Sequence, residues 1–453
     1  MNKKYIITGM VAFLLAATSC NKYLDVAPKG KVILTTVNDY DLFLNGQTLT
    51  ASGARELNLL ADNVDIPAIP QPATVQEDLI YLWTDQYTSD IKIAPVFWGK
   101  HYANIYRFNA VINGIDQAVN GTEADKKRIK AEALLGRSFE YLYLVNLYGK
   151  VYNSNTAGKD LAVPIISSTD ISAATPPRAT VQAVYDTIIN NIKAAIPGLL
   201  PNNATNRFRG SKQAAVSVLA RTYLYMGNYT EAAKYATEAL NESTSRLFDY
   251  NTISDRKNLP PFAIRSYEIY GRYSTSASTR EFPTVSFLQS FDTADLRLRY
   301  LYDNLGDLQF KTRGVTSFSP SGAVPSYGTS VEEMKLILAE CAARQGNTTE
   351  ALKQLNEIRI CRIRKSSYKA LSSQDSGEVL NWVIRERGWE LAYRGFRWFD
   401  MRRLDAEGRM PAVTRTTAND AAIATLPPHS PKYVIQIPIS VLAFNPDMPL
   451  NER

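Results

Sequence analysis

Two segments of the chain repeat one pattern of small and apolar residues, and this repeat restricts the possible folds more than any other feature. The first copy contains, in order, Leu219, Ala220, Tyr223, Gly227, Tyr229, Ala232, Ala236 and Ala239. The second copy has, at the same offsets, Leu338, Ala339, Ala342, Gly346, Thr348, Ala351, Leu355 and Ile358. The spacing is helical on both sides of each glycine, which predicts two helices joined by a turn. One such hairpin cannot bury its apolar face alone, so neighbouring hairpins must stack.

The repeat matches the tetratricopeptide pattern, in which small residues lie where the two helices touch and a glycine lies in the turn. The proline that usually follows the second helix is missing from both copies. A weaker partial match precedes Gly149. We therefore predict a mainly α protein with minor β structure and with tetratricopeptide-like helical units at about residues 100–150, 181–240 and 331–403.

Three other segments show a clear periodicity. Residues Asp125–Tyr148 carry a broad apolar stripe opposite a group of basic residues, and Gly149 is a candidate C-cap. Residues Val181–Ile196 repeat the helical pattern and stop at a Pro-Gly pair. Residues Lys432–Ile439 alternate as the residues of a strand do. These patterns predict two helices and one short strand.

Between the helical units lie two segments without helical spacing. Residues 50–100 and 241–330 are interrupted by Pro, Gly, Ser or Thr, and aromatic side chains are scattered through both. Long irregular segments inside a compact protein are usually functional loops. We interpret them as ligand-binding insertions within one domain that spans residues 20–453.

The N-terminus has the zones of an export signal. Lys3 and Lys4 are followed by an apolar stretch that is too short to span a bilayer. Two small residues then precede Cys20, the position at which bacterial lipidation attaches diacylglycerol, although Ala17 stands where the strict motif prefers Leu. We therefore expect a lipoprotein signal peptide at residues 1–19 and acyl chains on Cys20 that anchor the protein to a membrane. The alternatives are an ordinary signal cut nearby and an uncleaved anchor.

Charge and cysteine content exclude two classes of protein, nucleic-acid-binding proteins and disulfide scaffolds. The formal net charge is +7 at pH 7 and no run of basic residues forms a stripe, so nucleic acid is not an expected partner. Apart from Cys20, the chain contains only Cys341 and Cys361, which excludes a disulfide scaffold. These two lie near opposite ends of a predicted hairpin. A disulfide between them stays open, and two buried thiols are the favoured state.

The sequence offers little material for catalysis. His101 and His429 are the only histidines, so a histidine-based triad or a multi-histidine metal site is not expected. The chain has no P-loop and no glycine-rich nucleotide fingerprint. Carboxylate pairs of the kind that glycosidases use arise by chance in a chain with 44 acidic residues. We therefore expect a protein that is not an enzyme and has no cofactor and no metal, with a contribution from Ca²⁺ left open.

Four blocks of the chain are similar to one known family. They are the start Cys20–Pro28, the helix Ala131–Gly149, the stretch Arg385–Arg403 and the ending Ile435–Pro446. Together they resemble the SusD/RagB family of surface lipoproteins from Bacteroidetes. The stretch Arg385–Arg403 is the most specific, and it departs from the family pattern at Arg394, where an acidic residue is common.

The stretch Arg385–Arg403 has the composition of a structural element. Its charged residues at helical spacings, which favour ion pairs, are Arg385, Glu386, Arg387 and Glu390. Its apolar anchors are Trp389, Leu391 and Trp398. We therefore assign no chemistry to this stretch.

The resemblance implies a location, a partner and a ligand. Members of this family lie on the outer face of the outer membrane, held by a lipid, and cover a TonB-dependent barrel of the SusC type. They bind an oligosaccharide, or in some members a peptide, and deliver it into the barrel. The rival interpretation is a tetratricopeptide scaffold that assembles envelope proteins and binds no nutrient, although aromatic-bearing insertions are of little use to a scaffold.

Sugar rings stack their C–H faces on Trp and Tyr, while polar side chains bind the hydroxyls. The irregular segments supply the candidates for such a platform, which are Trp83, Tyr87, Trp98, Tyr267, Tyr270 and Tyr273. For each of these residues, packing in the core or within a loop is the alternative role.

Overall fold

The computed structural model describes residues 34–453 except 243, 276–279, 306–311 and 320–324. The expected signal peptide and the lipidation of Cys20 fall outside these residues. The described chain is mainly helical, with four two-stranded sheets, so the predicted fold class is confirmed. No helix within it is long and apolar enough to cross a membrane.

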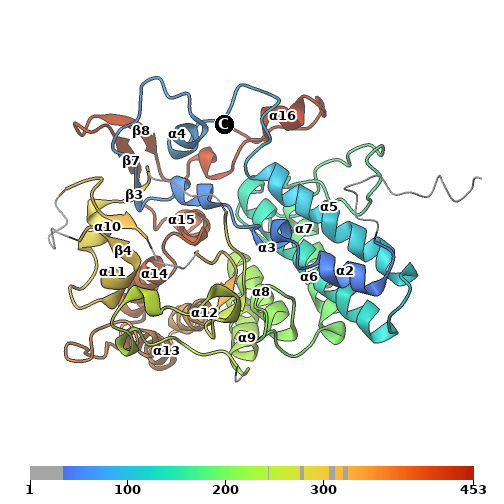
Figure 1. Ribbon diagram of the computed structural model, residues 1–453. Coiled ribbons are helices and arrows are strands. Elements are labelled where there is room, and N and C mark those ends of the chain that lie inside the picture. The colour runs from blue at the N-terminus through green and yellow to red at the C-terminus, as the bar shows by residue number, and fades with distance from the viewer. Residues whose placement is uncertain (1–33, 243, 276–279, 306–311, 320–324) are drawn as a thin grey trace, which may run out of the picture.

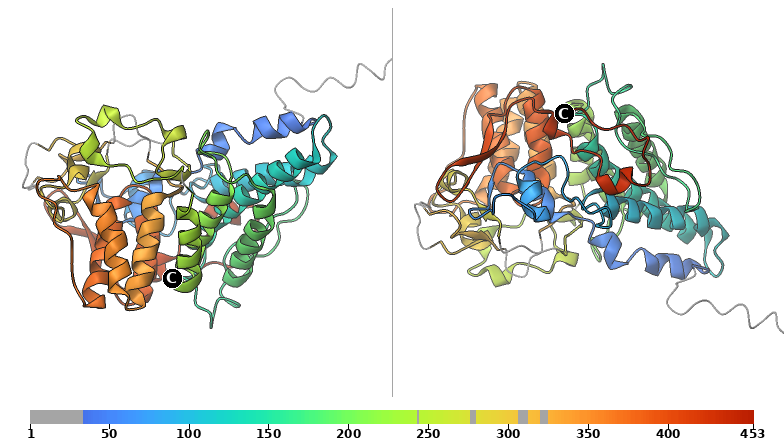
Figure 2. Two further views of the ribbon diagram at one scale, coloured as in Figure 1. Left: turned by 90° about the horizontal axis from the view of Figure 1, so that it is seen from below. Right: turned by 90° about the horizontal axis from the view of Figure 1, so that it is seen from above.

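The longer helices form one continuous stack, in which each helix packs against the next in the order α5, α6, α7, α8, α9, α12, α13 and α14 (Figures 1 and 2). Their bounds are α5 Trp98–Gly114, α6 Glu123–Tyr148, α7 Val181–Ala195, α8 Lys212–Tyr225, α9 Tyr229–Leu240, α12 Val331–Arg344, α13 Thr348–Ile360 and α14 Ser376–Glu390. The helix α15, Phe396–Ala406, follows α14 and lies against the irregular segment at residues 55–60.

The two copies of the sequence repeat are the hairpins α8–α9 and α12–α13. Each turn contains the predicted glycine in a left-handed conformation, with φ of 70° at Gly227 and 77° at Gly346, which glycine adopts without strain. In both turns the next residue is an asparagine whose side chain caps the second helix, because Asn228 and Asn347 each accept an N–H bond at 3.1 Å. The hairpin prediction is therefore confirmed in its local detail.

The helices predicted from periodicity are also present. The helix α6 starts after the N-cap Thr122 and ends at Tyr148, with Gly149 as its C-cap. The helix α7 ends one residue earlier than predicted and continues as a short 3-10 turn, Ile196–Gly198. A Cβ on Gly136 of α6 would come within 2.3 Å of the Phe108 ring, so this glycine sets the close contact between α5 and α6.

The remaining α-helices and the strands of the described chain are short, and several of them lie in the two irregular segments. They are α2 Val37–Phe43, α3 Gln47–Thr50, α4 Gln76–Tyr81, α10 Val285–Gln289, α11 Leu296–Leu301 and α16 Ile439–Leu442, with strands β1 Val64–Asp65, β2 Glu268–Tyr270, β3 Phe282–Pro283, β4 Tyr302–Asp303, β5 Ser317–Phe318, β6 Thr329–Ser330, β7 Val413–Thr416 and β8 Ala422–Leu426. The strands pair as β1–β3, β2–β6, β4–β5 and β7–β8, all antiparallel. The pair β1–β3 joins the two predicted insertions to each other.

The strand predicted at Lys432–Ile439 is wrong. The segment begins in a 3-10 turn, Pro431–Tyr433, runs extended without a strand partner and ends in α16. Its alternation has another cause, because the side chains of Ile435 and Ile437 pack into the core. A single bond from the Ile435 amide to the Leu147 carbonyl, at 2.9 Å, holds the segment against the end of α6.

The buried charged residues of α14 form ion pairs with other elements, which corrects the prediction of pairs along one helix. Glu386 lies 2.6 Å from Arg297 and 2.9 Å from Arg359, and Arg387 lies 2.9 Å from Asp400. Glu386 and Arg387 are each 1% exposed, so their partners come from the segments packed around the helix. The predicted apolar anchors, Trp389, Leu391 and Trp398, are all buried.

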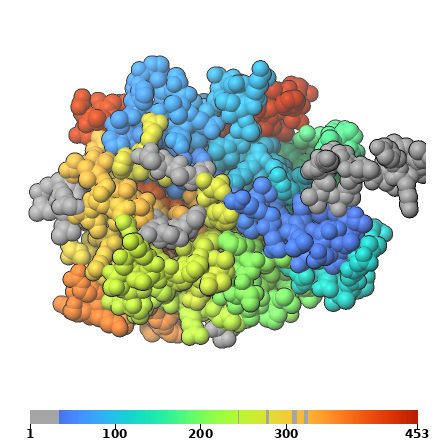
Figure 3. All heavy atoms as spheres, viewed as in Figure 1, coloured from blue at the N-terminus to red at the C-terminus, as the bar shows by residue number. Residues whose placement is uncertain are grey.

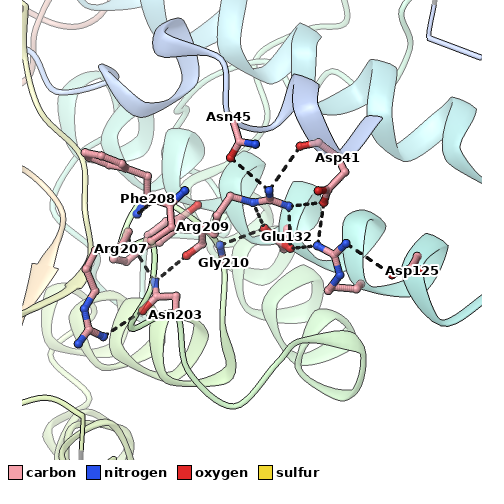
Figure 4. Close-up of polar contacts among 12 residues, drawn as sticks. Asp41, Asn45, Asp125, Glu132, Asn203, Arg207, Phe208, Arg209 and Gly210 are labelled. Atoms are coloured by element: carbon pink, nitrogen blue, oxygen red, sulfur yellow. Dashed lines mark hydrogen bonds and ion pairs between the residues drawn. The ribbon is translucent and has the colours of Figure 1, made fainter. Parts of the chain in front are cut away.

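A second ionic network fixes the N-terminal segment to the stack (Figure 4). Arg209 contacts Glu132 of α6 at 2.6 Å and Asp41 of α2 at 2.7 Å. Arg128 contacts the same two carboxylates, at 2.8 and 2.9 Å. The amide nitrogen of Asn203 donates to the Arg209 carbonyl at 2.7 Å, so the loop that carries Arg209 is itself held in place.

The two cysteines within the described chain are free thiols, as favoured from the sequence. Cys341 is buried and Cys361 partly so. Burial raises the pKa of the Cys341 thiol to about 12, which keeps it protonated and unreactive at neutral pH.

Candidate functional site

A pocket of about 460 Å³ opens between the start of α5, the loop before it and α16. We call it the Trp98 pocket, and it is lined by Ile91, Lys92, Ile93, Ala94, Pro95, Trp98, Gly99, Tyr102, Pro164, Ile166, Thr175, Ser440, Val441, Phe444 and Asn445. Figure 1 shows α16 beside α5 at the upper right, and Figure 3 shows the blue and red segments adjoining on the surface there. Three stretches that are far apart in the sequence therefore build one site.

The inner wall of the pocket consists of aromatic rings that hold one another in place. The Trp98 ring lies 4.9 Å from the Tyr102 ring and 4.9 Å, edge to face, from the Tyr148 ring. The Tyr102 hydroxyl donates to the Pro164 carbonyl at 2.7 Å, and burial raises its pKa well above the usual range. Trp98 is only 8% exposed, so it offers the pocket part of one ring.

The rim of the pocket is apolar and exposed. Phe444, in the turn after α16, is 83% exposed, and Ile91 and Ile93 are 49% and 44% exposed. Large apolar side chains that gather at a cavity mark binding sites on soluble proteins. The exposed ring of Phe444 is free to stack on a ligand that enters the pocket.

The polar groups of the pocket are few. Ser440 is 8% exposed, and its hydroxyl has no hydrogen-bond partner within the described chain. An unpaired buried hydroxyl costs about 1–3 kcal/mol, and a ligand that bonds to it removes that cost. Lys92 is the one charged residue among the lining residues, which include no carboxylate. The Asp90 carboxylate lies next to the lining and accepts from the Lys92 backbone N–H at 2.8 Å. The pocket can therefore hold an amphipathic ligand, but it lacks the groups for general acid–base chemistry.

The two histidines lie outside the lining of this pocket. His101 is buried, with Nδ1 2.6 Å from a Glu140 carboxylate oxygen. The exposed ring of His429 lies 3.7 Å from Asp405. Within the described chain, no group of three or more His, Cys, Asp or Glu side chains could hold a metal ion.

The six platform candidates do not assemble into one surface. Trp98 lines the pocket, and Tyr87 lines a much smaller adjoining cavity that shares Pro95 and Ser440 with it. Tyr267 lies just before the strand β2 and Tyr273 lies after it. Both are partly buried and packed against Phe rings, and neither lines this pocket.

A platform role does not fit Trp83 or Tyr270, because the structure covers both rings. Trp83 is 3% exposed, its indole N–H donates to the Leu60 carbonyl at 3.0 Å, and the Arg415 guanidinium lies 4.2 Å from its ring. Tyr270 is 1% exposed, with the Arg272 guanidinium 3.8 Å from its ring. Both rings pack in the core, which is the alternative role given for them.

Sequence reasoning missed Phe444, Ser440 and the two isoleucines at the rim. The signal for Phe444 was a large aromatic residue in a turn-rich tail, where no helix could bury it. The signal for Ile91 and Ile93 was a pair of apolar residues in a segment that also contains Asp, Lys and Pro. Ser440 gave no signal, because its unpaired state depends on the tertiary structure.

Comparison with known proteins finds one family throughout. Residues 22–224 match the family described as "Starch-binding associating with outer membrane", and residues 333–449 match the SusD family. SusD-like protein P2 of Formosa agariphila is 25% identical over 380 residues, which cover 70% of this chain and 72% of that protein.

Solved structures show the same fold. A SusD superfamily protein from Bacteroides thetaiotaomicron has a TM-score of 0.73 at 21% identity, covering 92% of this chain and 100% of that one. A SusD-like carbohydrate binding protein from Bacteroides vulgatus has a TM-score of 0.68 at 18% identity, covering 91% of this chain and 97% of that one.

Proposed function

This chain belongs to the SusD/RagB family, and we propose that it is a cell-surface lipoprotein that captures an oligosaccharide in the Trp98 pocket. We further propose that it delivers the ligand to an outer-membrane transporter of the SusC type. In this proposal the protein is a binding protein and not an enzyme. The observation that carries the proposal is an open pocket that combines aromatic rings with an unpaired, buried hydroxyl.

The dimensions and chemistry of the pocket suit such a ligand. Its volume of about 460 Å³ falls in the range of small-molecule sites, roughly 300–1,000 Å³. Phe444 supplies a ring face for the C–H side of a sugar, and Trp98 supplies the exposed part of its ring. Ser440, Asn445 and Lys92 supply groups that bind hydroxyls. The absence of acidic residues from the lining is consistent with binding without hydrolysis.

Titration calorimetry of residues 20–453 with a panel of neutral oligosaccharides tests the ligand. Phe444→Ala should weaken binding about tenfold, because an aromatic stack contributes roughly 0.5–1.5 kcal/mol beyond the area that it buries. Ala94→Trp should abolish binding by filling the pocket from its exposed edge. The matched control is Leu42→Ala, which removes another exposed apolar side chain, on α2. Full affinity in both pocket variants would remove the Trp98 pocket from the proposal.

Membrane attachment and the partner need separate tests. Cys20→Ala should release the protein from the membrane fraction, because the acyl chains have no other attachment point in the proposal. Protease added to intact cells should digest the wild-type protein, and protection would place it inside the envelope. Mild detergent extraction should co-purify a TonB-dependent barrel, and its absence would contradict the delivery role.

The apolar rim favours a second candidate, a peptide ligand. Ile91, Ile93 and Val441 offer contacts that suit apolar side chains better than sugar hydroxyls. The same titration with short apolar peptides decides between the two. Peptide binding that Ala94→Trp abolishes, together with no heat from any saccharide, would support the peptide.

A further inference from the structure

A second cavity, of about 350 Å³, lies between α10 and α14. We call it the Arg385 groove. Figure 1 shows α10 and α14 on the left of the molecule, whereas α5 and α16 are on the upper right. The groove shares no lining residue with the Trp98 pocket.

One wall of the groove is a face of α14. Asn381, Arg385 and Gly388 follow one another at helical spacing and all line the cavity. Arg385 is exposed, and its guanidinium lies 5.1 Å from the centre of the Trp389 ring. No ion pair to a described carboxylate engages it, in contrast to Arg387 and the other buried arginines nearby. The groove therefore contains a cation that is already oriented by a ring.

The floor of the groove is neutral overall but contains an unused donor. Arg397 of α15 binds both carboxylate oxygens of Asp62, at 2.5 and 2.7 Å, so these two charges cancel. Asn63, next to Asp62, is 6% exposed, and its amide nitrogen has no acceptor within the described chain. A buried amide N–H without an acceptor is costly, and a ligand oxygen in the groove would satisfy it.

The opposite wall presents hydroxyl groups from the α10 segment, which consists of α10 and its two capping residues, Thr284 and Ser290. Thr284, Ser286 and Ser290 all line the cavity. Ser290 accepts from the Trp389 indole at 2.8 Å and donates to the Phe287 carbonyl at 2.6 Å, which fixes its position. Thr284 and Ser286 are 3.3 Å apart. A ligand here meets several neutral donors and acceptors besides the single uncancelled positive charge.

We propose that the Arg385 groove binds an acidic sugar, a uronic acid unit of the glycan, with its carboxylate on Arg385. A guanidinium binds a carboxylate through two parallel N–H bonds, which gives orientation as well as affinity. The ring hydroxyls of the sugar then bond to Asn63 and to the serine hydroxyls of the α10 segment. This inference rests on the proposed function only in taking the ligand to be a saccharide.

The test is calorimetry of residues 20–453 with galacturonate, mannuronate and guluronate trimers and with their neutral methyl esters. At least one trimer should bind, and its methyl ester should bind at least tenfold more weakly. Arg385→Gln should lower the affinity for the acid by about ten- to a hundredfold, as expected for a charge-assisted bond, and leave that for the ester unchanged. Arg364→Gln, which removes another exposed arginine, is the matched control.

Gly388→Leu should block the groove and leave the fold intact. A Cβ at Gly388 meets no atom within 4 Å, so the leucine side chain has room to extend into the cavity, and leucine favours the helix more than glycine does. This variant should keep its thermal unfolding midpoint and lose binding of the acidic trimer.

Three results with the trimers would each overturn the proposal. They are no binding of any uronic acid trimer, equal binding of acid and ester, and full affinity in Gly388→Leu. Tighter binding of an aspartate-rich peptide than of every trimer would assign the groove to peptides and would also overturn it. Loss of neutral oligosaccharide binding in Phe444→Ala concerns only the Trp98 pocket, so the two proposals fail separately.

Discussion

The carboxylate of Glu281 should make the stability of the protein depend on pH. It lies 2.8 Å from Arg55, and its side chain is 11% exposed. Burial raises the pKa of Glu281 to about 7. The charge of Arg55 lowers this pKa, and the charges of Glu77 and Glu56 raise it further. Arg55 precedes β1 and Glu281 precedes β3, so this group reports on the junction between the two insertions.

The sign follows from proton linkage. The Glu281 carboxylate binds a proton more tightly in the folded state than in the unfolded state, where its pKa is 4.5. The contribution of Glu281 to stability is therefore present at low pH and is lost as the pH rises from about 4.5 to about 7. At roughly 1.4 kcal/mol for each unit, this loss amounts to about 3 kcal/mol.

Glu281→Gln isolates the effect, because glutamine has the shape of the protonated acid and does not titrate. Urea unfolding followed by circular dichroism, from pH 4 to pH 8, gives the free energy of unfolding of both proteins. The variant should gain about 3 kcal/mol relative to the wild type between these limits. Glu123→Gln, at a carboxylate with 79% side-chain exposure, is the control. A difference between Glu281→Gln and wild type that is constant with pH would show that folding does not raise the pKa of Glu281.

Two further predictions concern the stacked helices. Gly346→Ala should lower the free energy of unfolding by about 1 kcal/mol, because φ at this position is 77°. Gly388→Ala should raise the free energy of unfolding by up to about 1 kcal/mol, because Gly388 lies inside a helix and has free space at Cβ. Equal effects of the two substitutions in urea unfolding would contradict the turn geometry. Arg403→Ala should cost about 3–5 kcal/mol, since it leaves the carboxylates of Glu340 and Asp400 buried without this partner, and a loss below 1 kcal/mol would show that the network contributes little.

Local patterns predicted the helices well. The turn glycines Gly227 and Gly346, the C-cap Gly149 and the apolar stripe of α6 are all encoded within one or two helical turns of the chain. The mainly α fold follows from them, because hairpins with exposed apolar faces have to stack.

Long-range contacts could not be predicted in the same way. The partners of Glu386 are Arg297 and Arg359, which lie far from it in the sequence, and no spacing within α14 indicates them. Trp83 looked like a loop aromatic, and its burial depends on the packing of Arg415, more than three hundred residues further along the chain. The Trp98 pocket needs three separate segments, so the sequence supplied one of its rings and missed the exposed one, Phe444.

A crystal structure of the protein with a bound oligosaccharide would locate the ligand directly. Sugar rings should lie in the Trp98 pocket, with one ring against Phe444 and a sugar hydroxyl within hydrogen-bond distance of Ser440 Oγ. Sugar bound only at another surface, with the Trp98 pocket filled by water, would contradict this prediction.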